Sequence, residues 1–343
     1  MAAYLLRRLG QLIIVLIVAS IVVWYFLYLI PGDPVSALLG QNATPQQIAY
    51  ERMQLGLDKP LPLQYWIWLT HIVHGNLGVS FISGVPVTTL LAQRVPASLQ
   101  LDLLSLALGI VVAVVIGVLA ARRPRSWPGW IASGYATLAL AVPTFWLGIL
   151  LVLAFSVGLG WLPATSAFIP IWQQPGEAIK SLVLPVLCLG LYIGGILVRF
   201  VRAAMEEALG SDFVRTARMK GVSERRVVLK HALRNATLPT VTMIGLQIAV
   251  LIGGTVIVES VFAYPGIGTL VLSSVLQRDY VVLQSVIMIL VVAVVVINLA
   301  VDIAYAYLDP RVRLSTRSRR RSVNPSSPGT DQSKDEVRDV GVQ

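Results

Sequence analysis

Six long apolar segments limit what this chain can fold into. A helix needs about 20 apolar residues to cross a hydrocarbon core of about 30 Å, and each segment is near or above that length. Only 13% of the 343 residues are charged, whereas soluble domains carry about 25%. The sequence therefore predicts an all-α integral membrane protein with six transmembrane helices. The predicted spans are Leu9–Ile30, Leu99–Ala121, Trp130–Val157, Leu182–Val198, Leu238–Val258 and Val281–Tyr307.

Some of these segments have features that need a separate interpretation. Two arginines before the first segment are typical of a signal peptide, but the apolar run is long for one and no small-x-small cleavage site follows. We expect an uncleaved span. Pro143 in the third segment and Pro185 in the fourth predict kinks, which membrane helices tolerate; a contact with the substrate is the alternative role for these positions. For Asp102 and Asp302 we favour positions at the membrane interface over charges within the membrane.

The distribution of Lys and Arg predicts the orientation of the spans. Cytoplasmic loops of membrane proteins are enriched in these residues. With both termini in the cytoplasm, 22 of the 27 Lys and Arg residues fall on the cytoplasmic side, which also explains the net charge of +10 without nucleic acid. The predicted organisation is a cytoplasmic N-terminus (1–8), a first span (9–30), an extracytoplasmic region (31–98), a five-span core (99–308) containing a cytoplasmic loop (204–235), and a basic, disordered cytoplasmic tail (309–343).

The extracytoplasmic region contains one apolar stretch, Leu61–His74, that is too short to span the membrane. Its two tryptophans are typical of side chains at the level of the lipid headgroups, so we expect this stretch to lie at the interface or to pack on the bundle. His71 and His74 are three residues apart and could bind a metal. No neighbouring residues complete a ligand set, and we expect no metal site.

The polar interval from Ser211 to Asn235 is the strongest candidate for a functional element. Seven of its 25 residues are Lys or Arg, and Gly221 divides it into two helical runs. The first run, Asp212–Lys220, starts with an acidic residue and ends with cations, as the helix dipole favours. Gly221 suits the left-handed position after a helix, and Ser223 can cap the next one. This pattern indicates a folded element that docks on a partner; the alternative is a loop that only fixes the topology.

Motifs for chemistry are absent from the sequence. It contains no GxxxxGK[ST] phosphate loop, no HExxH, no GxSxG and no CxxC pair. The single cysteine, Cys188, excludes an intrachain disulfide. We therefore expect a non-catalytic protein that binds no cofactor itself, with a function in transport, channel formation or scaffolding.

Several ordered motifs resemble the permease subunits of bacterial dipeptide and oligopeptide ABC importers, in the broader nickel/peptide group. One such motif alone would be weak, but together and in order they are specific and cover nearly the whole chain up to about Leu314. The matching stretches are YLLRRL near the N-terminus, PGDP (Pro31–Pro34), GNLGVS (Gly75–Ser80), RVPASLQL (Arg94–Leu101), Phe213–Thr242, VESVFAYPGIGTL (Val258–Leu270), RDY (Arg278–Tyr280) and Asn298–Arg313.

The resemblance implies the type I ABC importer permease fold in a bacterial plasma membrane, and it implies that the polar interval is the ATPase-coupling loop. The superfamily motif E-A-A-x3-G-x9-I-x-L-P is matched here at Ala217 and Gly221, whereas Arg215 replaces the acidic first residue. An acidic contact therefore cannot be carried over to Arg215. The implied coupling residues are Asp212, Arg215, Thr216, Ala217, Arg218, Lys220, Gly221, Ser223 and His231.

The same resemblance implies the partners of the chain. They are a second homologous permease, two ABC ATPase subunits that bind ATP and Mg²⁺, an extracytoplasmic substrate-binding protein and membrane lipid. Pro265, Gly266 and Gly268 are candidates for an outer gate or for contact with the binding protein. The expected substrates are di- and oligopeptides. Nickel, haem, glutathione or opines remain alternatives within the group, and a stand-alone secondary transporter is a more distant one.

Overall fold

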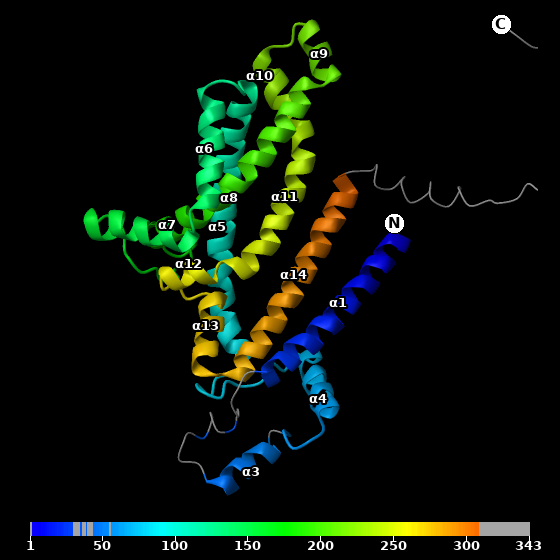
Figure 1. Ribbon diagram of the computed structural model, residues 1–343, viewed down its shortest axis with the longest axis vertical. Coiled ribbons are helices and arrows are strands. Elements are labelled where there is room, and N and C mark those ends of the chain that lie inside the picture. The colour runs from blue at the N-terminus through cyan, green and yellow to red at the C-terminus, as the bar shows by residue number, and fades with distance from the viewer. Residues whose placement is uncertain (1, 30–34, 36–38, 40–43, 55, 309–343) are drawn as a thin grey trace, which may run out of the picture.

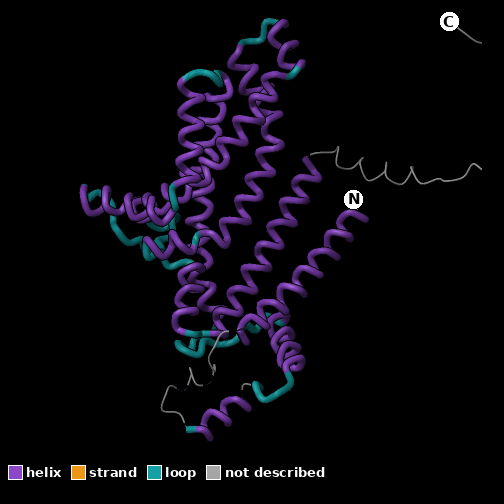
Figure 2. Tube along the Cα trace, in the orientation of Figure 1, coloured by secondary structure: helices purple, strands orange, loops and turns teal. Residues whose placement is uncertain are grey.

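The computed structural model describes residues 2–29, 35, 39, 44–54 and 56–308. Apart from one isolated β-bridge between Val79 and Pro86, the regular elements in these ranges are helices (Figures 1 and 2). The predicted tail (309–343) and the PGDP motif lie outside the described residues. The shorter helices are α3 (Pro45–Gln54), α4 (Leu61–Val73), α9 (Asp212–Met219), α10 (Glu224–Arg226), the π-helix η2 (Val227–Ala232), α12 (Val256–Val261) and α13 (Ile267–Gln277).

Two long helices, α5 (Val87–Arg122) and α8 (Pro175–Gly210), form the centre of the bundle. Small residues allow their backbones to approach closely. A Cβ on Gly109 would lie 2.8 Å from Cγ2 of Ile193, and one on Gly190 would lie 2.7 Å from Cδ2 of Leu108. The helices α6 (Trp127–Ala141) and α11 (Leu233–Gly254) pack against α8 and complete this core.

The first and last helices, α1 (Ala2–Leu29) and α14 (Tyr280–Leu308), lie side by side next to this core (Figure 1). Their ends at the two termini are on the same side of the molecule, in keeping with an even number of crossings. Arg8 and Asp302 form an ion pair across them at 2.8 Å. Many apolar side chains of α1 are exposed, among them Ile13, Ile14 and Val22. Such a surface is expected of a helix that faces lipid.

The third predicted span differs from the expected helix. The segment Trp130–Val157 is divided into α6, α7 (Thr144–Leu151) and the π-helix η1 (Val152–Gly158), with a bend of 101° between α6 and the α7–η1 segment. Pro143 lies at the bend as the N-cap of α7, because proline cannot continue the preceding hydrogen-bond ladder. Figure 1 shows α7 leaving the bundle sideways.

The other proline-containing spans also correct details of the prediction. Pro185 lies inside an unbroken α8, so it does not end that helix. The fifth span begins well before Leu238, and its helix bends by 52° at the residue preceding Pro239. The described helices comprise four that are long and apolar enough to cross a membrane, or six if each bent pair forms one span.

The short apolar stretch of the predicted extracytoplasmic region forms α4. None of its residues is buried, and it contacts α1 through aromatic and polar groups. The rings of Tyr65 and Trp24 meet edge to face at 5.7 Å, and the hydroxyl of Tyr65 lies 2.8 Å from that of Ser20. These contacts attach α4 to the first span, which fits the predicted packing on the bundle.

Candidate functional site

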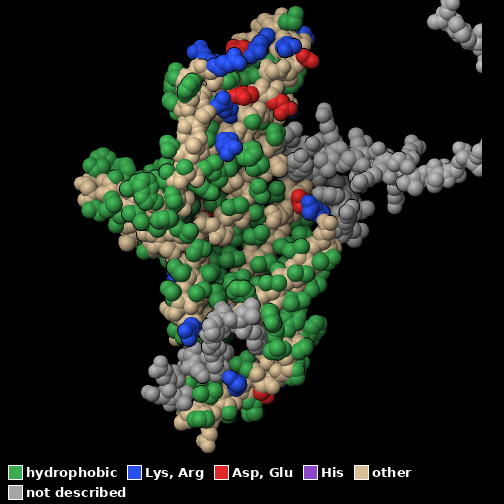
Figure 3. All heavy atoms as spheres, viewed as in Figure 1, with side chains coloured by type: hydrophobic (Ala, Val, Ile, Leu, Met, Phe, Trp, Pro, Cys, Tyr) green, Lys and Arg blue, Asp and Glu red, His purple; other side chains and the backbone are tan. Residues whose placement is uncertain are grey.

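The candidate coupling region, residues 211–232, forms one end of the molecule (Figure 1). Lys and Arg side chains gather on this end in the space-filling view (Figure 3). Arg122, at the end of α5, lies close enough to Glu224 to stabilise its carboxylate electrostatically. The loop between α5 and α6, which carries Arg123 and Arg125, therefore adjoins the coupling region. Two basic segments that are far apart in the sequence thus meet at one end of the molecule.

A small apolar cluster fixes α9 to the chain that follows it. Val214 and Ala217 lie one turn apart on the buried face of α9 and pack against Val227 of η2. Val214 and Val227 are both fully buried, and the half-buried Val222 closes the cluster. The polar interval is therefore a compact helical hairpin with a core of its own, rather than a solvated linker.

Gly221 ends α9 in the manner that the sequence predicts. Its φ of +75° lies in the left-handed region, which glycine adopts without strain. Its N–H donates to the carbonyl of Arg218 at 2.9 Å, and the N–H of Val222 donates to the carbonyl of Ala217 at 3.2 Å. These two bonds form a Schellman motif, and they reverse the chain so that Val222 reaches the apolar cluster.

An ion pair spans the same turn on its exposed side. The guanidinium of Arg218 donates to both carboxylate oxygens of Glu224, at 2.8 and 3.1 Å. This hydrogen-bonded partner lowers the pKa of the Glu224 carboxyl below its ordinary value. The two side chains are about half exposed. The ion pair therefore adds little to the stability of the turn, and its main effect is to hold the two side chains in a fixed orientation.

The other predicted coupling residues occupy several environments. Arg215 lies 3.7 Å from Asp212 in an exposed pair, and the Thr216 hydroxyl donates to the Asp212 carbonyl at 2.9 Å. Lys220 is the exposed C-cap of α9. Ser223 is the N-cap of α10 by backbone geometry, but its side chain makes no capping hydrogen bond, so the expected hydroxyl cap is wrong. His231 is not on α9 but in the last turn of η2.

Two exposed apolar side chains on α9 were not among the predicted residues. Met219 is 90% exposed and Phe213 is 43% exposed, although they belong to a folded helix with polar neighbours. A signal for them was present in the sequence. Once Val214 and Ala217 are assigned to the buried face, these two residues are left as the large apolar side chains on the outer face of a basic helix. Single exposed apolar side chains are common on protein surfaces, and these two become candidates for contact with another protein because they lie on the predicted coupling helix.

The coupling region continues directly into a membrane helix. α10, η2 and α11 follow one another without a break from Glu224 to Gly254. Val228 and Ala232 of η2 are buried in the main core of the bundle. The helix against which α9 packs through Val227 therefore continues into α11, through the bend before Pro239.

A second set of predicted residues surrounds a buried carboxylate, and we call this arrangement the Glu259 clip. Glu259 of α12 is fully buried and accepts a hydrogen bond from Ser98 of α5 at 2.6 Å. The N–H of Thr269, in the first turn of α13, donates to the other oxygen at 3.0 Å. Ser98 in turn accepts from the N–H of Ile267 at 2.8 Å. The clip ties α5, α12 and α13 together.

The glycines of the PGIG loop are explained by this carboxylate. A Cβ on Gly266 would lie 2.0 Å from Oε1 of Glu259, and one on Gly268 would lie 2.5 Å from Cα of Val256. Both glycines are buried, and Pro265 is half-buried. These contacts give the loop a packing role; its role as an outer gate or binding-protein contact remains a prediction.

Two further family motifs also meet in space. Asp279 of the RDY motif is 4% exposed and accepts a short hydrogen bond from Ser80, the last residue of GNLGVS. The hydroxyl of Ser285 donates to the carbonyl of Leu77 at 2.8 Å. A Cβ on Gly78, whose φ is +82°, would lie 2.7 Å from Val281. The segment Gly75–Ser80 is thus attached to the start of α14.

Among the described residues, no group of three or more His, Cys, Asp or Glu side chains is arranged to hold a metal ion. Asp102 is half-buried, and one of its carboxylate oxygens is buried without a hydrogen-bond partner in the described part of the chain. It lies within α5, which begins twelve residues before the predicted span. Its place at the membrane interface stays a prediction.

Comparison with known proteins gives the class to which this architecture belongs. Residues 113–314 match the family model of the binding-protein-dependent transport system inner membrane component, and residues 1–102 match the model of the N-terminal part of such components. The chain belongs to this family: it is a permease subunit of an ABC importer and a multi-pass inner-membrane protein. Such a permease works with ATPase and substrate-binding partners.

Individual relatives place it within the peptide/nickel group of these permeases. The chain is 41% identical over 313 residues to the glutathione transport system permease protein GsiC of Salmonella typhimurium (strain LT2) and of Escherichia coli (strain K12). Each alignment covers 91% of this chain and 99% of the relative. Among solved structures, an inward-facing form of the MetNI methionine ABC transporter is similar over 64% of this chain and 96% of that chain, with 19% identity and a TM-score of 0.52. This likeness supports the fold alone.

Proposed function

We propose that this chain imports small peptides, glutathione among them, by alternating access, and that the coupling region docks on an ATPase subunit. The observation that carries the docking proposal is α9, a helix with its own apolar core that projects from one end of the molecule and exposes Met219. A helix that is rigidly attached at a short turn transmits force, whereas a flexible linker does not.

The substrate proposal rests on sequence relatives. The identity of 41% to glutathione permeases extends over nearly their whole length, and glutathione is itself a small peptide with two carboxylates. The motifs that resemble dipeptide and oligopeptide permeases favour the same chemical class. Glutathione therefore replaces longer peptides as the first substrate to test, and both remain within one proposal.

The remaining parts of the transporter follow from the same proposal. A second permease completes the path across the membrane, and two ATPase subunits bind ATP and Mg²⁺, so that this chain itself binds no cofactor and catalyses no reaction. An extracytoplasmic binding protein delivers the substrate to the side that carries α3, α4 and the PGIG loop. Both termini lie in the cytoplasm.

Cysteine crosslinking tests the docking and the orientation together. In the complete transporter, Met219→Cys is expected to form a disulfide with a cysteine in the groove of an ATPase subunit. Gln46→Cys, an exposed position on α3 at the other end of the molecule, serves as the matched control and should not crosslink. Crosslinking from position 46 but not from 219 would reverse the proposed topology.

Transport assays test the rest of the proposal. Proteoliposomes containing the complete transporter should accumulate radiolabelled glutathione only when the binding protein and ATP are both present. Accumulation driven by an ion gradient without ATP would instead support a stand-alone secondary transporter.

A further inference from the structure

An open groove lies between α6 and α8, and its mainly apolar lining includes two arginines and a glutamate. Its volume is about 730 Å³, within the range of about 300–1,000 Å³ that small-molecule sites occupy. Its walls are one face of each helix, because the lining positions recur at helical spacing. The lining residues are Ser133, Ala136, Thr137, Leu140 and Ala141 of α6, and Arg199, Arg202, Ala203 and Glu206 of α8.

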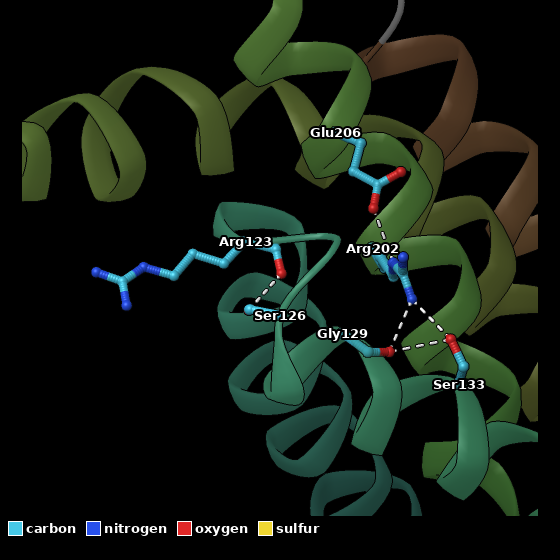
Figure 4. A network of polar contacts seen from close by, with 6 residues as sticks. All are labelled: Arg123, Ser126, Gly129, Ser133, Arg202 and Glu206. Atoms are coloured by element: carbon cyan, nitrogen blue, oxygen red, sulfur yellow. Dashed lines mark hydrogen bonds and ion pairs between the residues drawn. The ribbon is translucent and has the colours of Figure 1, made fainter.

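One of the two arginines in the groove is already engaged (Figure 4). Arg202 pairs with Glu206 at 2.7 Å, and it donates to the carbonyl of Gly129 at 3.1 Å and to the hydroxyl of Ser133 at 2.8 Å. Figure 4 shows this guanidinium reaching from α8 to α6. Arg202 and Glu206 therefore neutralise each other and join the two helices at the inner end of the groove.

The second arginine has no such partner. Arg199 lines the groove one turn from Arg202, and its side chain makes no hydrogen bond or ion pair among the described residues. Arg199 is exposed, and the groove thus carries one positive charge that no carboxylate among the described residues pairs with; Thr137 lines the same groove. A guanidinium with free donors binds a carboxylate or a phosphate through two parallel hydrogen bonds.

The position of Arg199 places this charge near the inner side of the membrane. It directly follows the predicted fourth span, which ends at Val198, and lies eleven residues before the end of α8. At 1.5 Å per residue this is roughly 16 Å from the coupling region. Charged side chains at such depths face a water-filled cavity or the interior of the protein rather than lipid.

Two faces of α6 differ in the side chains that they expose, and only one of them lines the groove. Trp127, Trp130 and Ile131 are strongly exposed and do not line the groove, and this aromatic and aliphatic surface suits lipid at the interface. The groove face instead consists mainly of small and hydroxyl side chains. A surface of this kind allows a polar solute to pass without tight binding.

We propose that this groove is the cytoplasmic mouth of the substrate path and that Arg199 contacts a carboxylate of the transported solute as it leaves. The inference rests on the proposed function as a peptide importer and adds to it a surface and a contact residue. The Arg202–Glu206 pair positions the groove walls, and Arg199 is the group that meets the solute.

The test uses the complete transporter in proteoliposomes, with radiolabelled glutathione as the probe. Arg199→Gln removes the charge and Arg199→Lys retains it. Lys180→Gln is the matched control, because Lys180 is an exposed cation at the other end of the same helix. Arg199→Gln is expected to slow import about three- to tenfold, as loss of a partly exposed charged hydrogen bond would. Arg199→Lys should recover most of the rate, and Lys180→Gln should not change it.

Two further readouts separate a direct contact from other causes. A photoreactive glutathione analogue should label α6 near Thr137 during turnover in the wild type, and this labelling should fall with Arg199→Gln. The abundance and thermal stability of the Arg199→Gln transporter should equal those of the wild type, since the substitution leaves the Arg202–Glu206 pair in place. Equal import by the wild type and Arg199→Gln would overturn the inference, as would equal loss with Arg199→Lys.

A lipid phosphate is the competing ligand for Arg199, and the lipid composition of the vesicles tests whether it binds there. If the effect of Arg199→Gln occurs only in vesicles that contain phosphatidylglycerol, and not in phosphatidylcholine alone, the groove binds a lipid phosphate and the inference is overturned. If the wild type fails to import glutathione, the proposed substrate is refuted and this inference with it. If the wild type imports glutathione and Arg199→Gln is equally active, the inference alone is refuted.

Discussion

The coupling region and the Glu259 clip both hold a short helix in place, but the first uses contacts that are local in the sequence and the second uses long-range contacts. Each must fix a short helix relative to a long one. The coupling region does so with contacts between neighbours in the sequence, since its apolar cluster, its Schellman motif and its ion pair all fall between residues 211 and 232. The clip joins Ser98 to Glu259 across 161 positions, and its acidic group is completely buried.

This difference has an energetic consequence. In the coupling region the charged groups remain hydrated, so that removing one costs little. In the clip, each donor to Glu259 would lose its only acceptor in a site closed to water, which costs much more. The coupling region can therefore change its surface without losing its fold, whereas the clip can tolerate few substitutions. The same contrast orders the following predictions by expected effect.

Glu259→Leu is expected to have the largest effect. It leaves the Ser98 hydroxyl and the Thr269 N–H without an acceptor, at about 1–3 kcal/mol for each group. We expect a loss of about 2–6 kcal/mol in stability and strongly reduced abundance in the membrane, measured by thermal unfolding of the detergent-solubilised protein. Glu207→Leu, at an exposed position on α8, is the control. Equal stability of the two variants would show that the clip is not a principal tertiary contact.

Gly221→Pro tests the local contacts of the coupling region, at the turn that ends α9. Proline cannot adopt a φ of +75° and removes the N–H that donates to Arg218, at a cost of about 3 kcal/mol to the turn. Because the spans do not depend on this turn, we expect normal membrane insertion but loss of substrate-stimulated ATP hydrolysis. Gly210→Ala, where a Cβ would meet no atom within 4 Å, should retain coupling. Retained coupling in Gly221→Pro would contradict the proposed lever.

Asp279→Asn examines a second buried carboxylate, which joins GNLGVS to RDY. The amide is a weaker acceptor for the Ser80 hydroxyl and for the Val282 N–H, so we expect a loss of about 1–3 kcal/mol. Limited proteolysis of the segment around Gly75 should become faster while the coupling region remains protected. Arg278→Gln, at the exposed neighbouring position, is the control. Faster cleavage in the coupling region instead would show that the two ends are not independent.

Glu224→Gln should have the smallest effect. Arg218 lowers the pKa of the Glu224 carboxyl below its ordinary value of 4.5, so the ionised pair stabilises the turn above that pH and its contribution is lost as the pH falls. An exposed pair of this kind contributes about 0.2–1 kcal/mol. Hydrogen exchange of residues 212–226 at pH 7 should be slightly faster in Glu224→Gln, and the difference from the wild type should shrink as the pH falls below 4.5, because Glu224 then becomes protonated in the folded protein as well. A difference that does not shrink as the pH falls would exclude the ion pair as its cause.

Much of the coupling region could be predicted from the sequence because its contacts are local. The division at Gly221, the helix Asp212–Met219 and the continuation into the fifth span follow from capping residues and dipole preference. The sequence interpretation nevertheless emphasised polar residues. It passed over Met219, whose exposure becomes evident only when Val214 and Ala217 are known to face Val227.

The sequence by itself determined that this chain is helical and embedded in a membrane, because apolar length and charge bias act on each segment separately. Tertiary structure alone decided how distant motifs meet. It turned α7 away from α6 at Pro143, placed Ser98 against Glu259, and opened the groove beside Arg199. Each of these depends on which helices become neighbours, and that choice reflects the packing of many side chains at once rather than the preference of any one segment.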